Sequence, residues 1–428
     1  MKVYLDTVGC RLNQSEIEKF AREFRAARHE LVDLPDKADL AVINTCTVTA
    51  AAAADSRKKV RQASRAGAGE IVVTGCWSTL SPCEANQLPS VARVVANNEK
   101  EKLVSDYLQI DDRDIAMESI ARLPIPGARQ RTRTFIKVQD GCDNRCTYCI
   151  TTVARGKGQS VPIDHVLADI HAALAGGAQE IVLTGVHLGS WGRDFSPRLT
   201  LRHLVQTVLV DTDTPRLRLS SIEPWELDVD FFSLWEDQRL CRHLHLPLQS
   251  GSPGTLQRMA RGTTPESFSR LVNEARRRIP GIAVTTDVIV GFPGETEAEF
   301  TESLAFIHGM NFAGGHVFTY SARTHTAAAK MPRQIPHSIR KSRNAQVRSV
   351  LSEAATEYQQ KYLGKQLSVL WERAQLSGDH CWRHEGLSDN YLRVLAHTSK
   401  NLRNCITPVR LQRIDSRTII GEVLEKSP

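Results

Sequence analysis

The sequence predicts an α/β protein of three parts: an N-terminal open parallel α/β domain, a central partial barrel of βα units, and a small C-terminal β-barrel. Strand-then-helix alternation occurs in two separate blocks, which is typical of parallel sheets covered by helices. A polar stretch separates the blocks, and short alternating strands end the chain. A length of 428 residues also favours two or three domains over one.

The N-terminal block, predicted over residues 1–112, carries short β-prone runs at residues 3–8, 39–44 and 70–74. Helical stretches follow the first two runs, from about residues 15 and 50. This repeat predicts an open parallel sheet. We expect a linker over residues 113–133, because Pro and Arg residues interrupt the alternation there.

The central block, residues 134–336, contains six predicted βα units. Its strands are expected near residues 135–138, 180–183, 216–220, 243–248, 283–290 and 315–319. Its helices include residues 163–174, 201–209, 265–279 and 297–308. Since a complete barrel of this type has eight such units, six predict an open, partial (βα)6 barrel.

A polar helix is predicted over residues 337–364 and a small β-barrel over residues 365–428. The barrel prediction depends on alternating strands at residues 367–371, 391–395 and 419–423. From residue 337 onward there are 15 Lys and Arg residues against 9 Asp and Glu, most of the net charge of +7. Charge alone is equally compatible with an RNA-binding surface and with an ordinary solvated basic surface.

The composition is that of a globular protein, with 41% hydrophobic and 24% charged residues. No window approaches the roughly 18 apolar residues of a membrane span, so we expect no membrane association. The N-terminus lacks an apolar signal core, so we expect a cytoplasmic location. Ten cysteines in such a chain indicate metal binding or redox chemistry, because cytosolic thiols are kept reduced.

Cys142, Cys146 and Cys149 stand in a Cys-x3-Cys-x2-Cys arrangement directly after the first strand of the central block. Zinc sites usually present Cys-x2-Cys pairs and four ligands, which makes zinc the less favoured alternative. Three thiolates on a cubane cluster leave one iron with an open coordination position. This spacing, with Tyr148 before the last cysteine, resembles the radical S-adenosylmethionine (SAM) superfamily.

Cys10, Cys46 and Cys76 each fall just past the end of one of the three N-terminal strands. In an open parallel sheet these strand ends face one crevice, so the three thiols are predicted to converge. Isolated cysteines are otherwise often small buried hydrophobic residues. We interpret the remaining four in that structural sense: Cys83, Cys241, Cys381 and Cys405.

Several motifs together resemble the methylthiotransferase family along nearly the whole chain. The N-terminal matches are residues 7–16, 44–49 and 74–76. The central matches are residues 137–142, 183–189, 220–224, 245–252 and 287–295. The chain departs from the family pattern at Thr152 and Val153, where a Pro and an aromatic residue are common, and at residues 323–326.

The resemblance implies two [4Fe-4S] clusters, on the two cysteine groups, with SAM as cofactor. By this resemblance the first cluster would reductively cleave SAM to a 5′-deoxyadenosyl radical, which would abstract the hydrogen on carbon 2 of an adenosine. The second cluster would hold or donate the sulfur, and another SAM molecule would supply the methyl group. The resemblance also implies which residues form the SAM site. The turns that carry them are equally compatible with a purely structural role. The residues are Tyr148, Gly185, Ser221, Glu223, Gln249 and Gly291.

The opening Gly-Cys-Arg-Leu-Asn-Gln resembles the branch that modifies N6-threonylcarbamoyladenosine next to the anticodon of tRNA. The implied partners are a tRNA anticodon arm held in part by a TRAM-like C-terminal barrel, an external electron donor and a sulfur source. The alternatives are the same chemistry on isopentenyladenosine or a ribosomal-protein aspartate, and a non-catalytic zinc and RNA-binding protein. Candidates for phosphate contact are Arg129, Arg131, Arg133, Arg340, Lys341 and Arg343.

Overall fold

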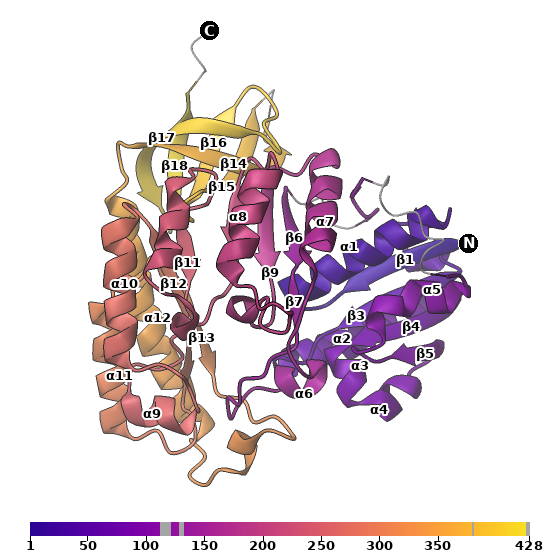
Figure 1. The fold of residues 1–428 in the computed structure, drawn as a ribbon, viewed down its shortest axis with the longest axis horizontal. Coiled ribbons are helices and arrows are strands. Elements are labelled where there is room, and N and C mark those ends of the chain that lie inside the picture. Colours follow the sequence, from indigo (N-terminus) through magenta and orange to yellow (C-terminus); the bar gives the residue numbers. More distant parts are fainter. Residues whose placement is uncertain (112–120, 128–131, 379–380, 425–428) are drawn as a thin grey trace.

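The computed structural model describes residues 1–111, 121–127, 132–378 and 381–424. It confirms the predicted fold class: an N-terminal parallel sheet with helices, a central set of parallel strands with helices outside, and a closed C-terminal barrel. Figure 1 shows the N-terminal domain beside the central domain and the C-terminal barrel above it. The predicted candidates Arg129 and Arg131 lie outside the described residues.

The N-terminal sheet is entirely parallel, with strand order β2-β1-β3-β4-β5. Its strands are β1 (Lys2–Thr7), β2 (Glu30–Val32), β3 (Leu40–Thr45), β4 (Glu70–Gly75) and β5 (Val91–Val95). Its helices are α1 (Arg11–Ala26), α2 (Ala50–Ala66), α3 (Cys76–Leu80), α4 (Pro82–Asn86) and α5 (Leu103–Leu108). One face packs on α1 and α5, and the other packs on α2 and α4. Successive residues of β3 point to opposite faces of the sheet, so apolar side chains of this strand pack into the core on each face.

Six strands of the central domain run in the predicted order. β6, β9 and β10 pair in parallel, as do β11, β12 and β13, and two isolated parallel bridges join the halves. The strands are β6 (Arg133–Lys137), β9 (Glu180–Thr184), β10 (Leu217–Leu219), β11 (His243–His245), β12 (Ala283–Val290) and β13 (Gly314–Thr319). The short β7 (Gln139–Asp140) and β8 (Gln159–Ser160) form a separate ribbon. β6 begins at Arg133, the last residue of the predicted linker.

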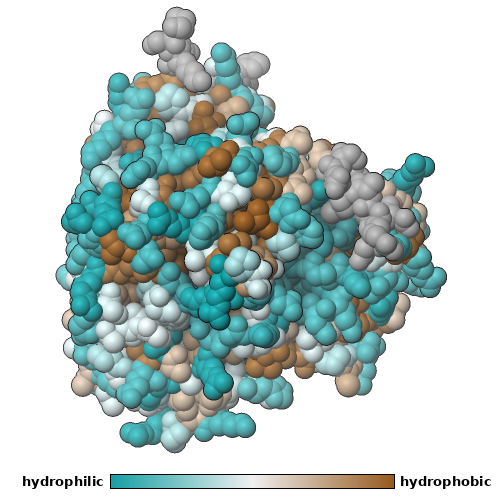
Figure 2. All heavy atoms as spheres, viewed as in Figure 1, coloured by the Kyte–Doolittle hydropathy of each residue, from teal (hydrophilic) through white to brown (hydrophobic). Residues whose placement is uncertain are grey.

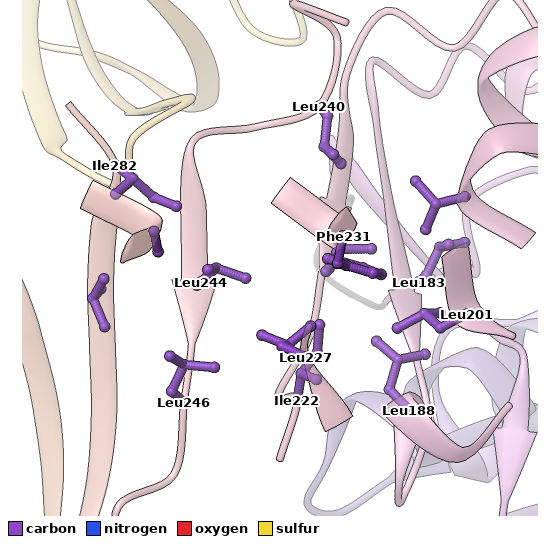
Figure 3. Packing of buried hydrophobic residues seen from close by; sticks show 14 of the residues in the cluster. Leu183, Leu188, Leu201, Ile222, Leu227, Phe231, Leu240, Leu244, Leu246 and Ile282 are labelled. Carbon is purple, nitrogen blue, oxygen red and sulfur yellow. The ribbon is translucent and has the colours of Figure 1, made fainter. Parts of the chain in front are cut away.

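Four helices cover the outside of these strands: α7 (Ile163–Ala175), α8 (Leu201–Asp211), α10 (Pro265–Arg278) and α11 (Glu297–Gly309). Two short helices, α6 (Thr151–Arg155) and α9 (Pro253–Arg258), contribute no residue to the core outside the strands. Alternate strand residues point outward into one large apolar cluster, including Leu183, Leu244 and Leu246, which Figure 3 shows beside Leu201 and Phe231. The other residues of the strands line the inside of the partial barrel. This interior therefore receives polar side chains without disturbing the core.

The C-terminal region begins with α12 (His337–Gln360), which packs on β13 and α11. The barrel is closed in the order β14-β15-β16-β18-β17. Its strands are β14 (Gln366–Leu376), β15 (Trp382–Ser388), β16 (Arg393–Thr398), β17 (Ile406–Asp415) and β18 (Thr418–Val423). Closure around the fully buried Trp371 leaves no open sheet edge.

The C-terminal barrel docks on the amino-terminal ends of the central strands. Arg218 pairs with Glu180 at 2.7 Å and donates to the Ser388 and Asp389 carbonyls, all within the interior. His243 stacks on Tyr391 with ring centroids 4.0 Å apart. Because buried charges require complete pairing, these contacts hold the barrel in one orientation. No helix among the described residues is long and apolar enough to cross a membrane.

Candidate active site at the domain junction

The first cysteine group lies on the loop between β7 and α6, at the carboxyl ends of the central strands. The Cys142 amide donates to the Gly156 carbonyl at 3.0 Å, and the Cys149 amide donates to the Cys146 carbonyl at 3.0 Å. Gly141 has a positive φ of 65°, and a Cβ there would lie 2.0 Å from the Lys157 carbonyl oxygen. Only glycine fits this turn, which directs the thiols toward the barrel opening.

Donor groups surround these three sulfurs. The Asn144 amide lies 3.4 Å from Cys142 Sγ, and Arg261 Nη1 lies 3.9 Å from Cys146 Sγ. Burial by itself lowers the pKa of His187, but hydrogen bonds to Cys142 and Glu226 outweigh it and raise that pKa to about 9. Positive groups and N–H donors of this kind favour thiolates and oppose the effect of burial, which raises the pKa of Cys146. The loop is therefore suited to hold a cluster through charged sulfur ligands.

The second group comes from three adjacent strands of the N-terminal sheet, as the strand-end argument predicts. Cys10 precedes α1, Cys46 follows β3, and Cys76 opens α3 directly after β4. A Cβ on Gly9, whose φ is +102°, would lie 2.5 Å from Cys46 Sγ. Burial, with a smaller contribution from nearby Cys10 and Cys76, raises the pKa of the Cys46 thiol to about 11. These three thiols are thus within electrostatic reach of one another.

All six cysteines are free thiols, in two groups of three without nitrogen or carboxylate ligands. Among the described residues, no group of three or more His, Cys, Asp or Glu is placed to hold a single metal ion. Sets of thiolates alone suit iron–sulfur clusters, and three per cluster leave one iron for another ligand. The donor chemistry therefore fits two [4Fe-4S] clusters, one for each group.

The barrel interior below the first group carries buried acceptors without partners. Gln249 Oε1, Asp287 Oδ1 and Ser220 Oγ are buried and have no hydrogen-bond partner among the described residues. Gln249 also has a positive φ of 69°, which directs its side chain away from the ordinary strand course. Since buried polar atoms are rarely left unsatisfied, a polar ligand in this interior would complete them. These residues fit a bound SAM or nucleoside.

The other predicted SAM-site residues have defined structural surroundings. Tyr148 packs edge-on against Phe292, with centroids 6.3 Å apart. Glu223 pairs with Arg261 at 2.6 Å, beside Cys146. Ser221 is exposed next to the strand bridge to His245, and Gly185 contacts Gln139.

Gly291 packs closely against an arginine of α12. A Cβ at this position would lie 2.2 Å from Arg340 Cγ, so only glycine fits beside that side chain. Its amide donates to Glu295 at 2.7 Å. Its place in the SAM site stays a prediction, and the structure shows a packing role for it as well.

A buried ionic network connects the two cysteine groups, and the sequence analysis did not identify it. Arg155, at the end of α6, donates to Glu16 at 2.9 Å, to Asp140 at 2.8 Å and to Asn13 at 2.8 Å. Lys100 pairs with the other oxygen of Glu16 at 2.9 Å. Glu16 and Asn13 lie on the helix that follows Cys10, whereas Arg155 follows Cys149. Each charge is neutralised, so the network fixes the two groups relative to each other.

Comparisons with known proteins agree with this arrangement. Residues 136–307 match the family described as the radical SAM superfamily, and residues 2–97 match the uncharacterized protein family UPF0004. Threonylcarbamoyladenosine tRNA methylthiotransferase MtaB of Bacillus subtilis is 34% identical over 420 residues, covering 96% of this chain and 93% of the relative. The chain belongs to the radical SAM methylthiotransferase family.

Other members of the family and one solved structure extend the comparison. The tRNA-2-methylthio-N(6)-dimethylallyladenosine synthase of Wolinella succinogenes is 29% identical over 443 residues, covering 99% of both chains. The radical SAM methyltransferase TsrM of Kitasatospora setae shares the fold at 16% identity, with a TM-score of 0.55 over 77% of each chain. Enzymes of this methylthiotransferase family use [4Fe-4S] clusters and SAM.

Two of the predicted phosphate contacts have partners within the protein. The Arg343 side chain is buried, pairs with Glu295 at 2.7 Å and Glu297 at 2.9 Å, and lies over Phe300. Arg340 donates to the Tyr320 carbonyl while covering Gly291. These two arginines stabilise the end of the barrel, and their contacts with phosphate stay predictions. Lys341 is exposed on α12.

Arg133 lies in a different setting, a cleft of about 830 Å³ between the central domain and the C-terminal barrel. It pairs with Glu372 at 2.6 Å. The cleft is lined by five arginines against two glutamates, Glu372 and Glu385; the arginines are Arg133, Arg373, Arg383, Arg393 and Arg403. Figure 2 shows hydrophilic residues interspersed with smaller hydrophobic patches on the visible face. Four of these arginines belong to the C-terminal barrel. The sequence analysis did not identify them individually and noted only the excess of basic residues in this part of the chain.

Proposed function

We propose that this protein converts N6-threonylcarbamoyladenosine, next to the anticodon of tRNA, to its 2-methylthio derivative. The observation that carries the proposal is the pair of three-thiol groups at one domain junction, joined through Arg155. Cleavage of SAM needs only the first group, so the second group is what favours sulfur transfer. The tRNA substrate is supported by the 34% identity to the Bacillus subtilis relative, along 96% of the chain.

The carbon 2 hydrogen of adenine is not acidic, so no side-chain base removes it and a cofactor is required. When bound, the clusters and SAM supply a radical for hydrogen abstraction, a sulfur atom and a methyl group. Cys142, Cys146 and Cys149 would hold one cluster at the barrel opening, and the N-terminal trio would hold the other. The hydrogen bonds of Arg155 fix the position of one cysteine group relative to the other. The polar barrel interior orients SAM and the base.

The arginine-lined cleft is the part of the surface best suited to the RNA backbone. The guanidinium group of arginine binds phosphate through paired hydrogen bonds. Five arginines against two glutamates give the lining of this cleft an excess of positive charge. We propose that the anticodon arm lies along this cleft while the target adenosine is turned into the barrel interior. The finer partners, an external electron donor and a sulfur source, belong to the same proposal, as does the cytoplasm, where tRNA is modified.

Arg393→Gln is expected to weaken binding of tRNA several-fold and to reduce the slope of log Kd against log salt concentration by about one. Arg393 is exposed on β16 in the cleft, so this change removes one phosphate contact without disturbing the barrel core. Filter binding over a salt series measures the effect. Arg413→Gln, on the exposed face of β17 outside the cleft lining, is the matched control. Equal weakening by both variants would argue against the cleft.

Mass spectrometry of digested tRNA tests the substrate directly. Cells that lack the gene are expected to accumulate N6-threonylcarbamoyladenosine and to lose its 2-methylthio derivative, and the gene on a plasmid restores the product. A loss of the 2-methylthio derivative of isopentenyladenosine instead would assign the protein to the dimethylallyladenosine branch. If cells with and without the gene contained the same methylthio-nucleosides, the proposal that tRNA is the substrate would be wrong.

A further inference from the structure

Arg11 is a cation at the domain junction that the proposed chemistry has not used. It follows Cys10 directly and is the first residue of α1. Its side chain reaches from the N-terminal domain to the central one, with the guanidinium carbon 5.9 Å from the centroid of the Phe135 ring on β6. Arg11 therefore lies between the sulfur-supplying cysteine group and the barrel wall.

The Arg11 side chain forms no ion pair or hydrogen bond with any of the described residues; its contact is the face of Phe135. Three other arginines near the two cysteine groups have partners, whereas Arg145, within the first group, is exposed on the surface. Arg155 pairs with Glu16 and Asp140, and Arg261 pairs with Glu223. Arg323 donates to the Thr47 carbonyl, next to Cys46. A half-buried guanidinium with all its donors open is an anion-binding group.

Arg11 is directed toward the barrel interior. Phe135 faces away from the outer apolar cluster, which takes its neighbour Ile136. The pKa of His243 on β11 lies well below its usual range, mainly because the side chain is buried and then because of the charges of Arg218, His245 and Arg11. The Arg11 charge therefore acts on the interior face of β11. Arg11 thus extends from Cys10 along the side of the interior where a base would be held.

We infer that Arg11 binds the carboxylate of the threonylcarbamoyl group of the substrate. This inference rests on the proposed function and names the residue that selects its substrate. Carbon 2 and carbon 6 of adenine both flank N1, and carbon 6 carries the N6 nitrogen, so a group on N6 extends along the edge that carries the reacting carbon. The reacting carbon must approach the sulfur held by Cys10, Cys46 and Cys76. A cation one residue from Cys10 is therefore correctly placed for this carboxylate.

The geometry also explains discrimination. A guanidinium fork matches the two oxygens of a carboxylate, and its contact with Phe135 orients the plane without using any N–H group. An isopentenyl group offers only hydrocarbon, so binding it would bury the Arg11 charge without a partner. Arg11 is consequently a specificity residue that contacts the substrate, separate from the groups that hold the clusters.

The test compares anticodon stem-loop RNAs that carry either N6-threonylcarbamoyladenosine or the same group with its carboxylate converted to an amide. For Arg11→Gln we expect kcat/KM on the natural substrate to fall about ten- to a hundred-fold, the range for a hydrogen bond to a charged group. Activity on the amide should equal that of the unaltered protein. Arg11→Lys, which keeps the charge, should restore part of the discrimination.

Two controls separate this inference from damage to the site and from failure of the proposed function. Iron content and SAM cleavage without RNA should be unchanged in Arg11→Gln, and Arg61→Gln, exposed on α2, should behave as the unaltered protein. The role of Arg11 would be overturned if Arg11→Gln lost the same factor of kcat/KM on both RNAs. It would also be overturned if Arg11→Gln still preferred the carboxylate RNA over the amide RNA as strongly as the unaltered protein does. No product from the unaltered protein on the threonylcarbamoyl RNA would instead overturn the proposed function, and the inference with it.

Discussion

Cys146→Ala is expected to abolish reductive cleavage of SAM, to the background of the assay. Three thiolates are the minimum that holds a cubane cluster while leaving one iron open to the cofactor, and the loop offers these three alone: Cys142, Cys146 and Cys149. Cys146 also contacts Arg261, which is paired with Glu223, so its loss removes a ligand that lies beside a buried cation. Formation of 5′-deoxyadenosine under dithionite, measured by chromatography after anaerobic reconstitution, reports the result.

Iron analysis of the same variant should show a loss of about four irons out of about eight per chain. Cys83→Ala is the matched control, because this cysteine is exposed on α4, which packs on β5 and α3 of the N-terminal domain. Its cleavage activity and iron content are expected to match those of the unaltered protein. Normal cleavage by Cys146→Ala would remove this cysteine from the cluster, and zinc without iron in the unaltered protein would favour the non-catalytic RNA-binding alternative.

The convergence of Cys10, Cys46 and Cys76 could be predicted because the strands before them are continuous apolar runs in the centre of a sheet. Such strands are easily identified, and the geometry of parallel sheets places their carboxyl ends together. The edge strands β2 and β5 were missed, since β2 has three residues and β5 includes the exposed Arg93. In the C-terminal barrel, β17 contains Pro408 and many polar residues, which hid its alternation.

Partners of charged residues could not be read from the sequence, because the pairs are far apart along the chain. Arg343 and Arg393 are equally basic in composition, yet the first is buried against Glu295 and the second lines the open cleft. Arg155 and Glu16 are separated by 139 positions and meet only when the domains pack. The same packing brings Arg11 onto Phe135. The two cysteine groups could therefore be proposed from spacing and strand order, whereas the charged residues around them are identified only by the packing of the domains.

Cys46→Ala is expected to separate the two halves of the chemistry: SAM cleavage persists, and the methylthio product disappears. Cys46 lies in the N-terminal sheet, and its packing partner Gly9 and hydrogen-bond partner Ser56 belong to the same domain. The loop of Cys142 is held instead by Gly156 and by neighbours in the central domain. Removing one thiol of the second trio therefore leaves the first cluster intact while eliminating the sulfur-supplying site. Paired assays of 5′-deoxyadenosine and of nucleosides from digested tRNA measure both halves in one reaction.

Cys46→Ser serves as the near-isosteric companion, because Cys46 is buried and alanine would leave a small void beside Gly9. If loss of product came from collapse of the N-terminal domain, serine would preserve the fold and restore activity; if it came from loss of the cluster, both variants would fail alike with about four irons remaining. The Arg155 network gives a further reason to expect this result, since it ties the domains together through Glu16 and Asn13 without using Cys46. Full methylthiolation by either variant would show that the sulfur reaches adenosine without the second cysteine group.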